Sequence, residues 1–198
     1  MKKACAIFAK LIRTVCIPPV MVAALILLLY GRQTAVFKTP TEAVVAFCLL
    51  ALLPSLAYPC SYMIASVRER GREGQRSLAM YFSVFGYVLA FFYGLLADCR
   101  AELRMLFCTY LLSVLLLLCV NKLLHIRASG HACSVTGPIV FCCYFLGLGG
   151  ILGGIAMYAL VLWSSLYLKR HTPTDFVLGT VTCLVSFFLS WLSFLAFV

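Results

Sequence analysis

The sequence predicts an all-α protein, a polytopic transmembrane helical bundle of about seven spans that forms one membrane domain over residues 1–198. Hydrophobic residues make up 64% of the chain and charged residues only 11%, and the mean hydropathy is +1.07. Soluble domains are about half apolar and a quarter charged. A chain of this length has too few interior positions to bury so much apolar surface in water. Because lipid offers no hydrogen-bond partners to the backbone, the spanning segments are expected to be helices.

The apolar segments are separated by short polar connections, with no soluble domain between them. Most of them approach the ~20 residues that cross ~30 Å of hydrocarbon. The N-terminal segment resembles a signal peptide, but its apolar run is long for one and no cleavage site follows it, so we expect a first span. Pro54 and Pro59 are expected to kink the second span. The expected spans are residues 14–31, 42–66, 77–97, 102–121, 133–147, 151–167 and 174–197.

Residues 132–165 determine the topology, because this apolar stretch is long for one helix and short for two. Its middle, residues 147–154, contains five glycines. Glycine weakens helices and lets neighbouring helices approach closely, so we expect two short antiparallel spans joined by a tight turn. This hairpin gives seven spans and brings residues 131 and 171 to one membrane face. A single long helix would give six spans and would put these residues on opposite faces.

The net charge of +10 comes from basic residues that lie between the apolar segments. There they are expected to set the orientation and to meet anionic head groups, so membrane lipids rather than nucleic acid are the expected partners. The eleven cysteines lie mostly inside apolar segments, with no Cys-x-x-Cys and no Cys/His cluster. We therefore expect neither a disulfide framework nor a metal site.

Two polar clusters, residues 127–131 and 169–175, lie at helix boundaries. His171 and Asp175 are four residues apart, so the carboxylate can orient the histidine and stabilise its charged imidazole. The run from Ser129 to His131 opens a helix whose free amides can bind an anion. Nearby positive charge comes from Lys122, Arg127, Lys169 and Arg170. This combination suits the chemistry of phosphate esters.

At these residues the chain resembles the type 2 phosphatidic acid phosphatase superfamily, also called lipid phosphate phosphatases. The family's second motif, Pro-Ser-Gly-His, is matched by residues 128–131, with Ala128 in place of proline. Its third motif, Ser-Arg-x5-His-x3-Asp, is matched by residues 164–175, with Ser165 in place of arginine. Its first motif, Lys-x6-Arg-Pro, is matched less closely by Lys122 and Arg127, which have four residues between them and no proline after them.

The resemblance covers roughly residues 120–197. It implies a phosphatase-like core over residues 122–198, with residues 1–121 as spans that have no assigned role.

The resemblance also implies a role for each matching residue. His171 would be the nucleophile that takes the phosphoryl group, Asp175 would orient it, and His131 would be the general acid that protonates the leaving alcohol. Ser129 and Gly130 would bind phosphate through side chain and backbone. Lys122 and Arg127 would clamp the phosphate, and Lys169 or Arg170 could replace the arginine that is missing at position 165. No metal or other cofactor is required.

The expected function is therefore a membrane hydrolase of lipid metabolism. It would dephosphorylate a lipid phosphate or a polyprenyl phosphate or diphosphate through a phosphohistidine. The alternative is a non-catalytic protein that binds or transports lipid phosphates, which the departures at Ala128 and Ser165 favour. A third interpretation is an unrelated small transporter with its site among the early spans, although those spans carry almost no charge.

The basic residues also predict an orientation. With a cytoplasmic N-terminus, twelve Lys and Arg lie in cytoplasmic segments and four in the others. The positive-inside rule then puts the N-terminus and the histidine site on the cytoplasmic face, although many members of the family act on the opposite face. The basic run from Arg68 to Arg76 is interpreted as an orientation signal. If the first segment does not cross, the orientation of the rest is reversed.

Overall fold

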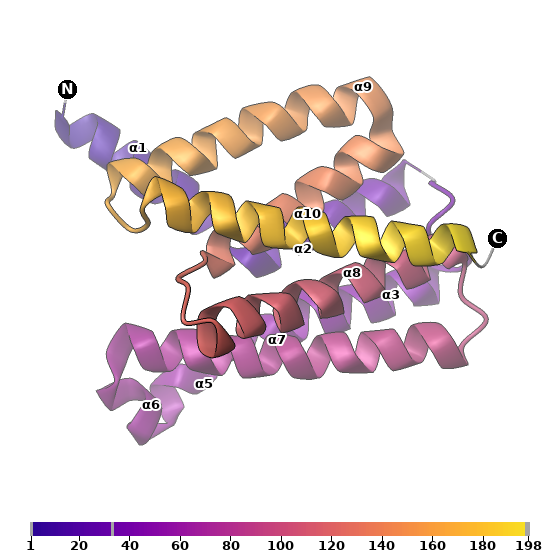
Figure 1. Cartoon of the computed structure of the whole chain (residues 1–198), viewed down its shortest axis with the longest axis horizontal. Coiled ribbons are helices and arrows are strands. Elements are labelled where there is room, and N and C mark those ends of the chain that lie inside the picture. Colours follow the sequence, from indigo (N-terminus) through magenta and orange to yellow (C-terminus); the bar gives the residue numbers. More distant parts are fainter. Residues whose placement is uncertain (1, 33, 197–198) are drawn as a thin grey trace.

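The structure is a computed structural model that describes residues 2–32 and 34–196. It is 86% helical, with no strand among the described residues, which confirms the all-α bundle. Most of the longer helices run along one common axis (Figure 1). The elements are α1 Lys2–Val15, α2 Pro18–Gly31, α3 Pro40–Phe47, η1 Cys48–Leu52, α4 Leu53–Ser55, α5 Ala57–Met63, α6 Ala65–Glu69, α7 Gly71–Leu96, α8 Ala101–Leu118, η2 Cys119–Leu123, α9 Gly130–Tyr167 and α10 Pro173–Ala196.

Within the described residues, five helical segments are long and apolar enough to cross a membrane, and a bent pair makes a sixth. This number is below the seven spans expected. The difference arises in α9, which counts as one continuous helix of 38 residues although its backbone is not helical at Gly147. The segments are Pro40–Met63, Gly71–Leu96, Ala101–Leu123, Gly130–Tyr167 and Pro173–Leu195, with Lys3–Val15 and Pro18–Gly31 as the bent pair.

The first expected span is a bent pair of helices rather than one helix. Residues 14–31 were predicted as one helix, but α1 ends at Val15 and α2 begins at Pro18, with a bend of 62° between them. Two consecutive prolines lack the N–H groups that would continue the helix from α1, and they suit the first turn of a new one. The N-terminal residues therefore form a separate helix, which packs against α9.

The second span is interrupted near Pro54, as expected. The segment Pro40–Met63 contains a wider helical turn, η1, immediately before α4, and a break at Leu56. A proline removes one backbone donor and widens the turn before it.

The basic run at residues 68–76 is helical rather than a polar connection between helices. Within it only Arg70 lies outside α6 and α7, and Gly71, the first residue of α7, has a φ of +56°.

The chain reverses direction inside α9, so its two ends lie at the same end of the bundle (Figure 1). Gly147 has φ +58° and ψ −139°, a combination that residues with a Cβ rarely adopt. The two arms are in contact: the Cys143 thiol donates to the Gly150 carbonyl at 3.7 Å. A Cβ on Gly154 would lie 2.9 Å from Ile139 Cγ2. The predicted hairpin is present, with its turn at the first of the five glycines.

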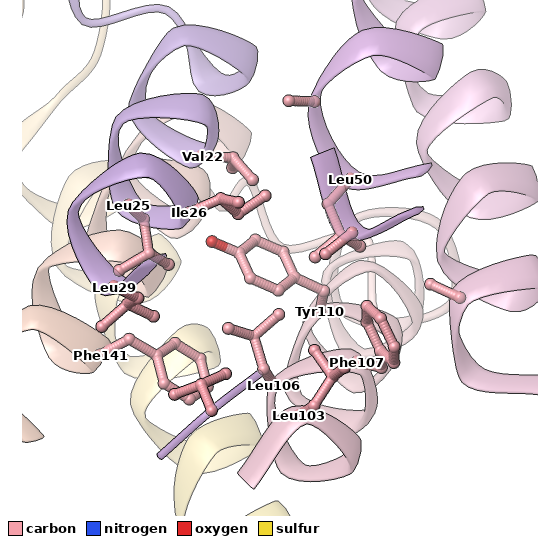
Figure 2. Close-up of a cluster of buried hydrophobic side chains, with 14 of the residues drawn as sticks. Val22, Leu25, Ile26, Leu29, Leu50, Leu103, Leu106, Phe107, Tyr110 and Phe141 are labelled. Carbon is pink, nitrogen blue, oxygen red and sulfur yellow. The ribbon is translucent and has the colours of Figure 1, made fainter. Parts of the chain in front are cut away.

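The main core lies between α2, η1, α8 and the first arm of α9 (Figure 2). The Tyr110 ring of α8 lies between Ile26 of α2 and Leu50 of η1, and stacks on Phe141 at 6.4 Å. Because lipid tails are as apolar as these side chains, close packing rather than water exclusion holds such helices together. The bundle therefore depends on how well α8 fits its neighbours.

Gly147→Ala is expected to lower the free energy of unfolding by about 1–3 kcal/mol, because alanine is strained at this positive φ. A steric clash does not contribute to this loss of stability, since a Cβ at position 147 would have no atom within 4 Å. The measurement is thermal unfolding in detergent micelles. Gly149→Ala is the matched control, because its Cβ is equally unhindered and its backbone is helical. Equal stability of the two variants would contradict the role given to Gly147.

Candidate functional site

The start of α9 is held by a polar loop. The Ser129 side chain accepts a hydrogen bond from the Ala132 amide at 3.2 Å and so caps the helix. One residue earlier, the Ala128 amide donates to the Asn121 side chain at 3.0 Å. A proline at position 128, as in the family motif, has no N–H for this bond. The residue at position 128 must therefore have a backbone N–H for the hydrogen bond to Asn121, and Ala128 provides it.

The start of α10 is held by a reciprocal cap. The Asp175 amide donates to the Thr172 hydroxyl at 3.1 Å, and the Thr172 amide donates to the Asp175 carboxylate at 3.3 Å. This is a capping box, with Pro173 at the first helical position. The carboxylate also pairs with Arg127 at 3.3 Å. Asp175 is thus engaged in holding the helix start and the neighbouring loop.

The two helix starts are joined directly. The Ser129 amide donates to the Asp175 carbonyl at 2.8 Å. Gly179 makes this approach possible, since a Cβ there would collide with the Ser129 carbonyl oxygen. The first turn of α9, which carries His131, and the loop before α10, which carries His171, are consequently fixed against one another at one end of the bundle.

A cavity of about 970 Å³ opens at this end. Cationic side chains surround its outer part, and it reaches inward between α7 and α8 as far as Tyr87 and Tyr110. Along α7 the distance from Arg76 to Tyr87 corresponds to about 16 Å at 1.5 Å per residue. The cationic and histidine side chains that line it are Arg13, Arg72, Arg76, Lys122, Arg127, His131, Arg170 and His171.

Both predicted site histidines lie in this cavity. His131 Nε2 and His171 Nδ1 are buried, and neither has a hydrogen-bond partner among the described residues. His171 Nδ1 has no hydrogen-bond partner within residues 2–32 and 34–196, and the Asp175 carboxylate bonds Thr172 and Arg127. That Asp175 orients His171 stays a prediction. The carboxylate acts on His171 through its charge.

The predicted phosphate-binding residues divide into two groups. Lys122, Arg127, Gly130 and Arg170 line the cavity. Ser129 and Lys169 do not line it. The Ser129 hydroxyl is buried because it caps α9. Lys169 lies in the loop after α9, is exposed, and has a φ of +51°. Phosphate binding by each of these residues stays a prediction.

Many cavity residues come from residues 1–121, the part of the chain with no assigned role. Three of them are cationic: Arg13, Arg72 and Arg76. Arg72 and Arg76 are four apart on α7, a spacing that puts both on one helix face. That spacing would have signalled a shared surface if the run had been interpreted as helix rather than connection. No local signal marks Arg13, because its neighbours in the cavity are distant in sequence.

Burial lowers the pKa of His171 to about 4, from an ordinary value of 6.5, and the positive charges of Arg13 and Arg76 act in the same direction. The nearby Asp175 carboxylate opposes this shift. Because the pKa is lowered, the imidazole is neutral at pH 7 and becomes charged only as the pH falls through 4. A neutral imidazole has the free lone pair that a nucleophile needs.

The arrangement can bind an anion and transfer a group to nitrogen. Cations and the first amides of α9 attract negative charge, and a neutral His171 stands beside a second imidazole that can carry a proton. Residues 2–32 and 34–196 contain no group of three or more His, Cys, Asp or Glu side chains placed to hold a metal ion.

No protein-family model, curated protein or solved structure matches this chain. The resemblance to lipid phosphate phosphatases therefore rests on the motif residues themselves.

The pKa of His171 is expected near 4 when followed by NMR through its ring resonances. Arg76→Gln removes one of the positive charges that act on this imidazole and should raise the pKa toward 6.5. Arg32→Gln, at the opposite end of the bundle, serves as the control and should leave it unchanged. A pKa at or above 6.5 in the parent protein would show that His171 is not in this cationic, buried environment.

Proposed function

We propose that this protein is a membrane phosphatase that hydrolyses a lipid phosphate or a polyprenyl phosphate or diphosphate through a phosphohistidine. One observation carries the proposal: two imidazoles, each with a buried and unpartnered nitrogen, share one cavity with six cationic side chains. Buried polar atoms in proteins almost always have a partner. Their lack of one among the described residues favours a polar ligand at this place, and the cations favour an anionic one.

The proposed reaction has two steps. A ring nitrogen of His171 attacks phosphorus, the bond from phosphorus to the ester oxygen breaks, and His131 donates a proton to the leaving alcohol. Water then attacks the phosphohistidine, His131 takes a proton from that water, and inorganic phosphate leaves. A bound phosphate dianion supplies the negative charge that a protonated His131 needs among so many cations. The cations stabilise the charge on the transferred phosphoryl group.

A binding protein without turnover is the second candidate. Ser165 provides no cation, and its buried hydroxyl has no partner within residues 2–32 and 34–196. In the same residues, the Asp175 carboxylate bonds Thr172 and Arg127 rather than His171. These features favour a site that holds a lipid phosphate and does not cleave it. Turnover of substrate distinguishes the two candidates.

We further propose that the site faces the cytoplasm. The segments that carry twelve of the Lys and Arg residues lie at the end of the bundle where α9 and α10 begin (Figure 1). The α2–α3 connection, the α7–α8 connection and the first turn of α8 lie at the other end, and they carry the remaining four: Arg32, Lys38, Arg100 and Arg104. The positive-inside rule assigns the richer end to the cytoplasm.

Purified protein is expected to release inorganic phosphate from a lipid phosphate without added metal. His171→Ala should lower the rate at least about 10³-fold because the nucleophile is lost, and His131→Ala about 10²–10⁴-fold because the proton donor is lost. Substrates to screen are phosphatidic acid, phosphatidylglycerol phosphate and polyprenyl phosphates. His125→Ala is the control, since this exposed residue does not line the cavity. Full activity of His171→Ala would exclude the mechanism, and binding without release would favour the second candidate.

The orientation can be tested with a protease site inserted into one connection at a time. A site after residue 35 should be cut from outside intact cells, whereas a site after residue 125 should be cut only after the membrane is opened. The reverse pattern would place the histidines on the outer face.

A further inference from the structure

Arg13 is the cavity residue whose chemistry the predicted motifs leave unexplained. It lies in the last turn of α1, lines the cavity, and has a buried Nη1 with no hydrogen-bond partner among the described residues. Its charge acts on Arg72 and Arg76, and none of the three forms an ion pair with an acid in the described part of the chain. Glu73 is the one acid among the residues that line the cavity, so positive charge is in excess there, and such an excess is relieved when an anion binds.

The position of Arg13 is set by the packing of α1 on the second arm of α9. Phe8 lies against Trp163 with ring centroids 6.0 Å apart, and the Cys16 thiol contacts the Met157 sulfur at 3.6 Å. Ile12, next to Arg13, is buried with Val161 in one apolar cluster. Since these contacts lie before and after Arg13 along the chain, they fix the backbone that carries its guanidinium beside the cavity.

The same contacts show that α1 runs antiparallel to the second arm of α9, because Phe8 contacts Trp163 and Cys16 contacts Met157. Arg13 therefore lies farther from the end of that arm than Phe8 does, and it lines the cavity, whereas Ser165 does not. The cavity thus receives a guanidinium from a helix outside the predicted phosphatase-like core.

Arg13 also acts on both imidazoles. Its positive charge is the largest electrostatic influence on His171 after burial, and it acts on His131 as well. An anion bound between the histidines would therefore lie within reach of the same guanidinium. A planar guanidinium can donate two parallel hydrogen bonds to a tetrahedral phosphate.

We propose that Arg13, through its buried Nη1 and the rest of its guanidinium, binds the phosphoryl oxygens of the substrate. This inference rests on the proposed function and adds a phosphate ligand from outside the predicted core. The ligand chemistry is a phosphate group, whether free or esterified to a lipid. The helix α1 is accordingly part of the site rather than only a membrane anchor.

The test uses the full-length protein in detergent micelles, with two readouts. Binding of inorganic phosphate is measured by isothermal titration calorimetry, and phosphate release from the lipid phosphate that the screen identifies gives kcat/KM. Arg13→Gln should weaken phosphate binding at least about 10-fold and lower kcat/KM about 10²-fold, by loss of charge-assisted hydrogen bonds to the transferred group. Arg13→Lys should recover part of both. Lys10→Gln, one turn earlier and exposed, should change neither.

The outcomes separate this proposal from the phosphatase proposal. If Arg13→Gln binds and hydrolyses like the parent protein, Arg13 has no phosphate role while the phosphatase stands. If no lipid phosphate is hydrolysed but phosphate binding depends on Arg13, the phosphatase fails and the Arg13 site stands. If Arg13→Gln does not fold, Arg13→Lys decides, because it keeps the charge and loses the two-pronged geometry. Unchanged phosphate affinity in that folded variant would overturn the proposal.

Discussion

The reversal of α9 at Gly147 is the constraint on which the rest of the structure depends. A straight helix of 38 residues would be about 57 Å long at 1.5 Å per residue, nearly twice the ~30 Å hydrocarbon thickness. Such a helix would carry His131 and His171 to opposite faces. The positive φ of Gly147 folds the helix onto itself, and the small residues that follow allow the two arms to touch. The histidine cavity exists because of this turn.

The reversal of α9 brings the loop before α9 and the loop before α10 to the same end of the bundle. The contact between the starts of these two helices then fixes one loop against the other. The Ser129 amide, the Asp175 carbonyl and the bare Gly179 form that contact. Asp175 contributes both main chain and side chain, since its carboxylate closes the α10 cap and pairs with Arg127. One residue therefore stabilises the frame around His171, which differs from the direct orienting contact that its spacing suggests.

The surrounding cations give the cavity its chemical character and carry an electrostatic cost. Six Lys and Arg side chains from α1, α7 and the segments that flank α9 line it, against the single acid Glu73. Repulsion among them is relieved when an anion binds, so the arrangement of charges favours an anionic ligand. The N-terminal helices, which lack family motifs, supply half of this charge.

The sequence by itself determined the membrane bundle, the order of the helices and the hairpin in residues 132–165, because hydropathy and glycine act locally along the chain. It also singled out His131 and His171. Only the tertiary structure decided that Asp175 caps α10, that residues 71–76 are helical, and that Arg13 meets histidines more than a hundred residues away. Those outcomes depend on how helices pack against one another, and no window of sequence contains the contacts involved.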